Sequence, residues 1–312
     1  MSDVAFVMGG AGFLGSHVAD ALSDAGYKVR VFDRVRSPFL REDQEMVIGD
    51  ILDLDGLTAA MEGARYVYNF AGLADIDDAK NRPIDTVKLN ILGNTHALEA
   101  ARIQKIERFV FASSIYVYSE SGSFYRASKQ SAERFVETYQ ERYGLDYSTV
   151  RYGSLYGRRA DARNGIYRFL KQALVEKRIK FSGSPDAQRE YIHVQDAARL
   201  SVEVLKPEFR NRHIILTGNE RMSVVNLMKM IAELSPAPVQ LEFDEMIRKA
   251  HYEMTPYAFN PRIGTKLVSN EYVDLGQGLM DCLAEIYETL HAAEYMDTPS
   301  GWLAHGDHEV TE

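Results

Sequence analysis

Residues 4–15 read VAFVMGGAGFLG, and this stretch decides the fold. A short apolar run is followed by three glycines in the spacing G-x-x-G-x-x-G, at Gly9, Gly12 and Gly15. An Ala-rich helical pattern follows, so the order is strand, glycine turn and helix. In that order, backbone N–H groups and the helix dipole can hold a pyrophosphate. Gly9 would permit the tight turn, Gly12 would let the backbone approach the phosphates, and Gly15 would let helix and strand pack closely.

The next predicted strand ends in Asp33, which stands 18 residues after Gly15. A carboxylate near this offset accepts hydrogen bonds from the adenine-ribose hydroxyls and repels a 2′-phosphate. The position therefore favours NAD over NADP. Arg34 is the opposing signal, because a guanidinium can accommodate a 2′-phosphate. An aspartate that only ends a strand in a turn is the structural alternative.

The composition is that of an ordinary globular protein with a large core. The chain has 312 residues, 46% of them hydrophobic and 26% charged, with a formal net charge of −9. This charge gives no support for binding to nucleic acid or to an anionic membrane. No apolar stretch approaches the ~18 residues of a membrane span, and the N-terminus shows no signal peptide. We therefore expect a cytoplasmic protein.

Cys282 is the only cysteine, which excludes an intrachain disulfide and a zinc cluster built from cysteines. The eight histidines show no paired ligand spacing, so no metal site is predicted. Cys282 lies in the apolar pattern of a late helix, where packing in the core is its expected role.

Apolar runs alternate with helical patterns through the first half of the chain. This alternation predicts parallel strands joined by right-handed helical crossovers, with helices on both faces of the sheet. The continuous apolar run of residues 108–112 fits a sheet buried on both sides. The predicted class is α/β, with a Rossmann-type doubly wound parallel sheet. The predicted strands are 3–8, 28–33, 45–49, 65–71, 108–114 and 147–152, and the predicted helices are 13–25, 53–62, 83–104 and 126–143.

The pattern changes after about residue 155. A polar, basic loop at residues 158–165 precedes helices expected near 166–177, 223–235 and 277–292. We expect residues 1–155 to form an NAD-binding domain, with a segment near 190–200 returning to it. Residues 156–295 would form mainly a smaller C-terminal substrate-binding lobe. Residues 296–312 would form a mobile tail.

Tyr125 and Lys129 are four residues apart at the start of a predicted helix, so they lie on one face, one turn apart. An ammonium near a phenol lowers its pKa from about 10 toward neutrality, which would make Tyr125 a base for a sugar hydroxyl. Such a pair taken alone is most often solvated surface. Ser114 changes that reading, because it ends the preceding strand, and ligands of open α/β sheets lie outside the carboxyl ends of the strands.

Together these motifs resemble the extended short-chain dehydrogenase/reductases that act on nucleotide sugars. The resemblance covers roughly residues 3–290, and the motifs occur in the family's order. They are residues 9–15, Asp33, GDI at 49–51, NFAG at 69–72, Ser113-Ser114, Tyr125-x-x-x-Lys129, RY-x-x-x-YG starting at Arg151, and REYIHV-x-D at 189–196.

The resemblance implies NAD as the cofactor and assigns three catalytic residues. Tyr125 would be the base, Lys129 would hold the nicotinamide ribose and tune Tyr125, and Ser114 would bind the reacting hydroxyl. Asp50 and Ile51 would contact adenine. The other implied cofactor contacts are Gly9, Gly12, Phe13, Leu14, Gly15, Asp33, Arg34, Phe70, Ala71, Gly72 and Tyr152.

On the substrate side, Arg189 resembles the family's arginine on the sugar-nucleotide diphosphate, where a guanidinium fork suits phosphate oxygens. An ion pair with Glu190 or Asp186 is the alternative. The other implied substrate contacts are Ala74, Ser114, Ser154 and Asn164.

The residue after Ser114 bears on which reaction is catalysed. The 4,6-dehydratases and decarboxylases of this group carry an acidic residue there, whereas this chain has Ile115, which cannot transfer a proton. The pattern instead resembles the 4-epimerases, which act through a transient 4-keto sugar. A nucleotide-sugar 4-dehydrogenase, a 4,6-dehydratase and a non-enzymatic NAD-binding redox regulator remain as alternatives.

Two departures from the family border the expected sugar site. Ser114 and Tyr125 are only 11 residues apart, which is shorter than in most relatives. Gly153-Ser154 stands where many relatives have an aromatic residue followed by Asn. Both departures suggest an unusual substrate or outcome.

Two predicted helices carry apolar stripes that include Val87, Ile91, Leu98, Phe135 and Tyr139. In relatives, the corresponding helices pair across a two-fold axis into a four-helix bundle. The resemblance therefore implies a homodimer. Packing of both helices on the sheet is the alternative.

Overall fold

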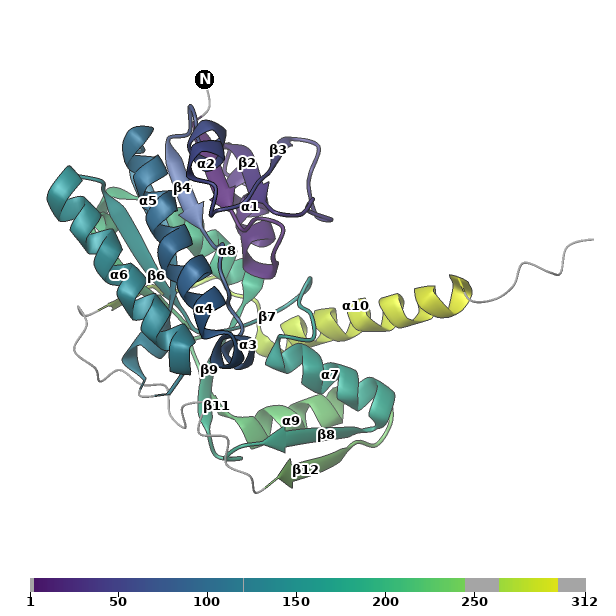
Figure 1. Cartoon of the computed structure of the whole chain (residues 1–312). Helices are drawn as coiled ribbons and strands as arrows, with labels where there is room; N and C mark the ends of the chain where they lie inside the picture. Colours follow the sequence, from purple (N-terminus) through teal and green to yellow (C-terminus); the bar gives the residue numbers. More distant parts are fainter. Residues whose placement is uncertain (1–2, 120, 245–263, 297–312) are drawn as a thin grey trace, which may run out of the picture.

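The computed structural model describes residues 3–119, 121–244 and 264–296. Its centre is an eight-stranded parallel sheet in the order β13-β10-β6-β5-β4-β1-β2-β3 (Figure 1). The α/β class with a doubly wound sheet is thereby confirmed. The strands are β1 (Val4–Met8), β2 (Lys28–Asp33), β3 (Gln44–Ile48), β4 (Tyr66–Asn69), β5 (Arg108–Ser114), β6 (Tyr147–Tyr152), β10 (Arg212–Leu216) and β13 (Thr265–Lys266).

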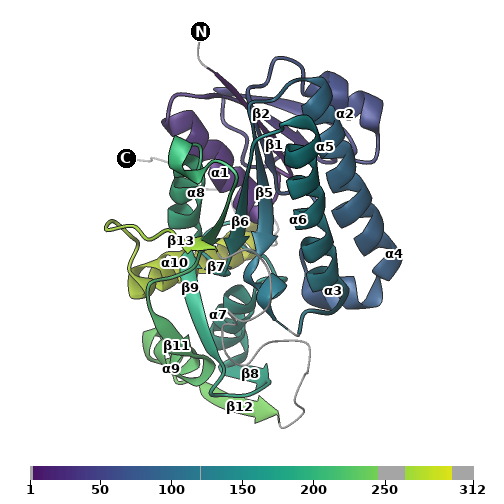
Figure 2. The same ribbon diagram turned by 90° about the vertical axis from the view of Figure 1, so that its left-hand side faces the viewer.

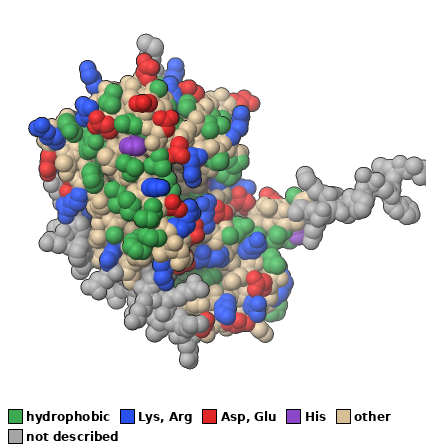
Figure 3. Space-filling view, viewed as in Figure 1, with side chains coloured by type: hydrophobic (Ala, Val, Ile, Leu, Met, Phe, Trp, Pro, Cys, Tyr) green, Lys and Arg blue, Asp and Glu red, His purple; other side chains and the backbone are tan. Residues whose placement is uncertain are grey.

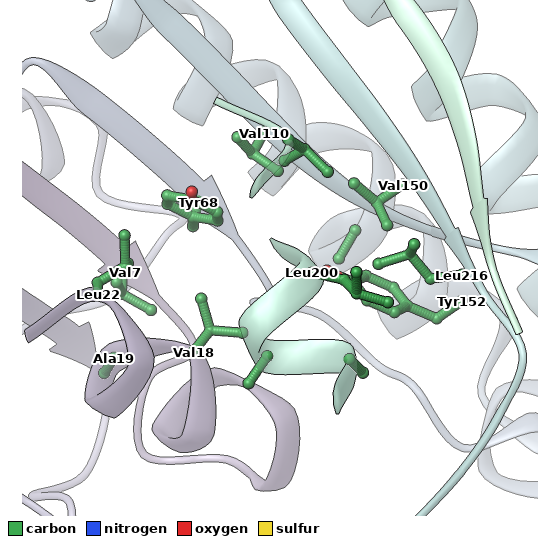
Figure 4. Packing of buried hydrophobic residues seen from close by; sticks show 14 of the residues in the cluster. Val7, Val18, Ala19, Leu22, Tyr68, Val110, Val150, Tyr152, Leu200 and Leu216 are labelled. Atoms are coloured by element: carbon green, nitrogen blue, oxygen red, sulfur yellow. The ribbon is translucent and has the colours of Figure 1, made fainter. Parts of the chain in front are cut away.

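Helices cover both faces of this sheet. α1 contacts α8 on one face, while α5 contacts both α2 and α6 on the other face. Strand β1 shows the cause, because Val7 packs into the α1–α8 core and Phe6 into the opposite core. Figure 4 shows Val7 beside Val18 and Leu22 of α1. The five helices are α1 (Phe13–Asp24), α2 (Leu54–Ala60), α5 (Gly93–Ile103), α6 (Ser123–Tyr143) and α8 (Val194–Glu203).

The strand order fixes where a ligand can bind. β1 is followed by β2 and β3 in one direction, and the chain then crosses to β4, β5 and β6 on the other side of β1. Connections therefore leave the carboxyl ends of β1 and β4 in opposite directions and open a crevice there.

A smaller lobe lies beyond the carboxyl ends of the strands (Figure 2). It has its own core, which includes Leu170, Leu227 and the buried Cys282. Burial raises the pKa of the Cys282 thiol to about 12, and its place in this core fits the predicted packing role. The elements of this lobe are β7 (Ser154–Tyr156), α7 (Gly165–Glu176), β8 (Arg178–Ser182), β9 (Gln188–His193), β11 (Arg221–Ser223), α9 (Val224–Leu234), β12 (Gln240–Asp244) and α10 (Leu275–Met296).

Several elements differ from the sequence-based prediction. The predicted helix 83–104 consists of α4 (Pro83–Thr86), a π-helix η1 (Val87–Leu92) and α5. The short helix α3 (Ile76–Asn81) and the sheet strands β10 and β13 were not predicted. The predicted tail 296–312 lies outside the described residues except for Met296. Within the described ranges, we find no helix with the length and apolar character needed to cross a bilayer.

Candidate active site

A cleft of about 1640 Å³ opens at the carboxyl ends of the central strands and extends to the smaller lobe. Its wall runs from the glycine turn after β1 to Arg189 on β9. Among the described residues, every site residue predicted from the sequence lies on this wall except Asp50. The topology thus brings together side chains that are far apart in the chain.

The glycine turn is held tightly against its neighbours. Gly9 has φ +74°, and a Cβ there would lie 2.6 Å from the backbone nitrogen of Ala71. A Cβ on Gly15 would lie 2.3 Å from the carbonyl oxygen of Gly9, so no side chain fits between helix and turn. Gly12 is the N-cap of α1, and the described residues provide neither a side-chain cap nor an acid in the first turn. The N-terminus of α1 is therefore suited to hold a phosphate.

Asp33 at the end of β2 is fixed by the glycine turn. Its Oδ2 accepts a hydrogen bond from the backbone N–H of Ala11 at 3.1 Å. Arg34 also lines the cleft at this end. The carboxylate of Asp50 instead accepts a hydrogen bond from the N–H of Leu52 at 2.9 Å, whereas Ile51 lines the cleft. Asp50 therefore has a local structural contact and does not line the cleft, and its contact with adenine stays a prediction.

The three predicted catalytic residues converge where β5 meets α6. Ser114 ends β5, Tyr125 and Lys129 lie in the first two turns of α6, and all three are buried. Ser114 hydrogen-bonds to Tyr125. The Ser114 hydroxyl oxygen also accepts from the N–H of Tyr116 at 3.3 Å. The Ser114 oxygen is therefore oriented from two sides.

In the protein without NAD, the pKa of Tyr125 is set by burial and not by the Lys129 ammonium. Burial raises the pKa of Tyr125 to about 12, and the hydrogen bond with Ser114 only partly opposes it. Lys129 Nζ donates to the carbonyl oxygen of Ala112 at 2.8 Å and lies 5.8 Å from the centre of the Tyr125 ring. Burial lowers the pKa of Lys129 to about 8. The expectation that Lys129 alone brings the pKa of Tyr125 toward neutrality is therefore wrong.

Asn90 is a site residue that the sequence analysis missed. It lies in the π-helix η1, where its side chain donates to the Leu73 carbonyl at 3.0 Å and accepts from the Leu73 N–H at 2.7 Å. It also donates to Ser128 Oγ at 2.9 Å, and Ser128 in turn donates to the Tyr125 carbonyl at 2.7 Å. Asn90 therefore ties the loop beside Gly72 to the helix that carries Tyr125. A polar residue within an apolar helical run was the only available signal.

The residue that faces the cleft after Ser114 is Tyr116, not Ile115. Ile115 is buried in a small apolar cluster, while the ring of Tyr116 lines the cleft with its centre 6.3 Å from that of Tyr125. The 3₁₀ helix η2 (Ile115–Tyr118) produces this arrangement. Ile115 still provides no proton donor. The residue that borders the site after Ser114 is the second one along the chain, Tyr116.

The end of the cleft where the sequence predicts the sugar is lined by Arg189, Ser154 and Ala74. Arg189 Nη1 donates to the Gln188 carbonyl at 3.0 Å. The carboxylate of the neighbouring Glu190 lies 3.2 Å from Arg221 and 3.3 Å from Lys266. The alternative ion-pair partner Glu190 is therefore engaged by these two cations.

Two predicted contact residues have structural hydrogen bonds that the sequence did not indicate. Asn164 is the N-cap of α7, where it accepts from the Tyr167 N–H at 3.1 Å and donates to the Leu155 carbonyl at 2.8 Å. The Tyr152 hydroxyl lies 2.6 Å from Ser201 Oγ in the core. Both residues line the cleft, but these polar groups face the protein.

Among the described residues, no three His, Cys, Asp or Glu side chains gather in a metal-binding cluster. The groups that converge are a glycine turn, a ribose-binding carboxylate position, and the Ser114, Tyr125 and Lys129 side chains. This arrangement matches the dinucleotide site expected from the sequence, and it brings Ser114, Tyr125 and Lys129 to one wall of the cleft.

Residues 5–216 match the NAD dependent epimerase/dehydratase family, and the chain belongs to it. NAD is accordingly its cofactor, and the cradle of Gly9, Gly15 and Asp33 fits that molecule. A putative UDP-glucose 4-epimerase of Methanocaldococcus jannaschii is 27% identical over 72% of this chain and 80% of that protein. A trifunctional UDP-glucose 4,6-dehydratase of Arabidopsis thaliana, which is also named as an epimerase and reductase, is 27% identical over 73% of this chain and 39% of that protein.

Solved structures share the fold. A UDP-glucose 4-epimerase of Thermotoga maritima, determined with UDP-glucose, has a TM-score of 0.78 and 22% identity over 92% of this chain and 99% of that chain. A UDP-N-acetylglucosamine 4-epimerase of Methanobrevibacter ruminantium has a TM-score of 0.80 and 23% identity over 93% of this chain and the whole of that chain. At these identities the likeness concerns the fold alone.

Proposed function

We propose that the protein is an NAD-dependent nucleotide-sugar 4-epimerase. The observation that carries the proposal is the convergence of Ser114, Tyr125 and Lys129 at one point of the cleft, between the glycine turn and Arg189. Ile115, buried where the dehydratases place an acid, supports epimerisation over loss of water. The relatives named as 4-epimerases support the same reaction.

In this proposal, the phenolate of Tyr125 removes the proton of the sugar 4-hydroxyl, which Ser114 orients. The glycine turn and Asp33 would hold NAD, which would supply a reversible hydride acceptor for C4 of the sugar and a positive charge that favours the phenolate. Lys129 holds the nicotinamide ribose and adds positive charge near Tyr125. The 4-keto sugar turns over while Arg189 retains its diphosphate, and Tyr125 returns the proton.

The test is incubation of the purified protein with UDP-, GDP-, CDP- and dTDP-sugars, followed by NMR of the products. A C4 epimer formed without net NADH supports the proposal. Stoichiometric NADH release would instead show a 4-dehydrogenase, and a product lighter by one water would show a dehydratase. If Tyr125→Phe changed none of the measured activities, the protein would be an NAD-binding regulator. Tyr143→Phe, an exposed tyrosine on the same helix, is the matched control.

The same proposal assigns a different ligand to each of the two parts of the fold. The glycine turn and residues up to about 155 bind NAD, and the smaller lobe binds the nucleotide sugar. A cytoplasmic location fits the single buried cysteine.

We also propose that two copies pair through the helices α4, η1 and α6. Figure 3 shows hydrophobic side chains gathered on the side where Figure 1 places these helices. Val87 is 49% exposed and Phe135 39%, so the sheet does not cover them. Leu98 is fully buried and cannot take part, which corrects the predicted stripe. The other exposed apolar residues there are Ile84, Leu92, Phe124 and Tyr143.

Sedimentation velocity tests this interface. We expect a dimer for the wild-type protein and a monomer for Phe135→Glu, because a charge is poorly tolerated in an apolar interface. Val175→Glu changes another exposed apolar residue, on α7, and should leave the dimer intact. A monomeric wild-type protein would refute the pairing.

A further inference from the structure

A buried group of charged side chains lies directly behind the proposed catalytic residues. Glu133 is one helical turn beyond Lys129 on α6, and it is only 4% exposed. The guanidinium of Arg151 from β6 is fully buried and binds it through two bonds, Nε to Oε1 at 3.0 Å and Nη2 to Oε2 at 2.7 Å. This forked pair is neutral overall, which makes its burial tolerable.

The pair is connected to three further elements. Ser113 of β5 donates its hydroxyl to Glu133 Oε1 at 2.5 Å. Arg151 contacts the Tyr118 hydroxyl of η2 at 2.5 Å and His213 Nδ1 of β10 at 2.9 Å. His213 Nε2 lies 2.9 Å from Glu137 of α6, which also receives Arg134 at 2.8 Å. The charged and titratable groups around Glu133 therefore come from α6, η2, β6 and β10, and β5 adds a hydroxyl.

The geometry gives Glu133 two connections to the chemistry. Its bond to Ser113 fixes the last residues of β5, so the neighbouring Ser114 is held against the helix that carries Tyr125. Its negative charge also acts on Lys129, where it opposes the loss of the proton that burial promotes.

We propose that Glu133 is a positioning residue, which holds Ser114 in register with Tyr125 and acts electrostatically on Lys129 one helical turn away. The inference rests on the proposed function for the roles of Ser114, Tyr125 and Lys129. Two variants separate the two effects. Glu133→Gln removes the charge and leaves an oxygen that can accept from Ser113. Ser113→Ala removes that hydrogen bond and leaves the charge.

The first measurement does not need turnover. In NAD-loaded protein with [ε-¹³C]lysine, the Lys129 signal is assigned by its loss in Lys129→Arg, and its pH titration is followed by NMR. Because Glu133 raises the pKa of Lys129, we expect the midpoint to move to lower pH in Glu133→Gln and to stay in place in Ser113→Ala. An unchanged midpoint in folded Glu133→Gln would overturn the charge effect.

The second measurement is the pH profile of epimerisation. We expect Ser113→Ala to lower kcat by about ten- to a hundredfold with little change in KM, because Ser114 is displaced from the reacting hydroxyl. Glu133→Gln should also move the alkaline limb of the profile to lower pH. A kcat within twofold of wild type in folded Ser113→Ala would overturn the positioning effect.

Loss of one partner leaves a buried charge, so Glu133→Gln can fail to fold. The double variant Glu133→Gln/Arg151→Met removes both charges. Because loss of the Arg151 cation opposes loss of the Glu133 anion, a smaller downward move of the Lys129 midpoint than in Glu133→Gln is then expected. If the wild-type protein epimerises no nucleotide sugar, the proposed function fails while the NMR titration still decides the charge effect.

Discussion

The two ends of the cleft are built in different ways. The end proposed to bind NAD, at the glycine turn, is the nucleotide end. Its shape is set by the backbone, because Gly9, Gly15 and the Asp33–Ala11 hydrogen bond leave no room for other side chains. The end proposed to bind the nucleotide sugar is the sugar end. There, side chains such as Ser154 and Arg189 come from separate segments and meet only in the folded protein. Local sequence therefore specifies the nucleotide end, while the sugar end depends on tertiary structure. The two ends should respond differently to mutation.

The largest expected effect is on turnover, at the junction of the two ends. Tyr125→Phe removes the proton acceptor and keeps the ring, so kcat should fall by at least about a hundredfold. The affinity for NAD, measured by calorimetry, should stay within a few-fold because the glycine turn is untouched. A large loss of NAD affinity would mean that the two ends are not separable in this way.

Gly15→Ala should damage the nucleotide end together with the fold. Its Cβ would lie 2.3 Å from the carbonyl oxygen of Gly9, so α1 must shift away from the turn. We expect a loss of about 1–3 kcal/mol in the free energy of unfolding and weaker NAD binding. Gly12→Ala is the matched control, since its Cβ would lie 3.2 Å from the same oxygen and should cost less stability. Chemical denaturation of both variants gives the comparison.

Arg189→Gln should act on the sugar end alone. If the guanidinium binds the diphosphate, its loss removes charge-assisted hydrogen bonds and raises KM for the nucleotide sugar by roughly ten- to a hundredfold. NAD affinity should not change. Arg221→Gln alters a neighbouring arginine on β11 that contacts Glu190, and it should leave KM near the wild-type value. Equal effects of the two substitutions would contradict the diphosphate role.

The smallest effect concerns pH and stability. The pKa of Lys129 falls from 10.5 to about 8 on folding, so between these values the unfolded chain binds more protons than the folded protein. The free energy of unfolding should therefore rise with pH through this window. Lys129→Met lacks this contribution, so the stability difference between the two proteins should change from pH 8 to pH 10. Thermal unfolding of both proteins without NAD measures it, and a constant difference would contradict the pKa.

Much of the nucleotide end could be predicted because its requirements are local. The glycine spacing and the offset to Asp33 are set by the geometry of one strand, one turn and one helix. The alternating apolar runs likewise revealed the strands up to β6. The hydrogen bond of Asp50 with Leu52 could not be predicted, because an aspartate after a strand can serve a ligand, its own turn or both.

The sugar end and its support could not be predicted in the same way. Asn90 acts through a π-helix, whose extra residue per turn changes which side chains face the site. Tyr116 faces the cleft because η2 turns the chain immediately after Ser114. Glu133 resembles an ordinary surface charge in sequence, and its pairing with the buried Arg151 of β6 appears only in the folded protein. Each case requires a contact between distant segments.

The parallel sheet also bears on how the protein is made. β6 is buried along its whole length, and its outer edge is covered by β10, which starts at residue 212. During translation, the nascent chain leaves this edge unpaired for roughly 3–12 s, while the 59 intervening residues are added. An open edge of this kind invites pairing with other chains. The synthesis of residues 153–211 is therefore the interval in which a chaperone would matter most for this protein.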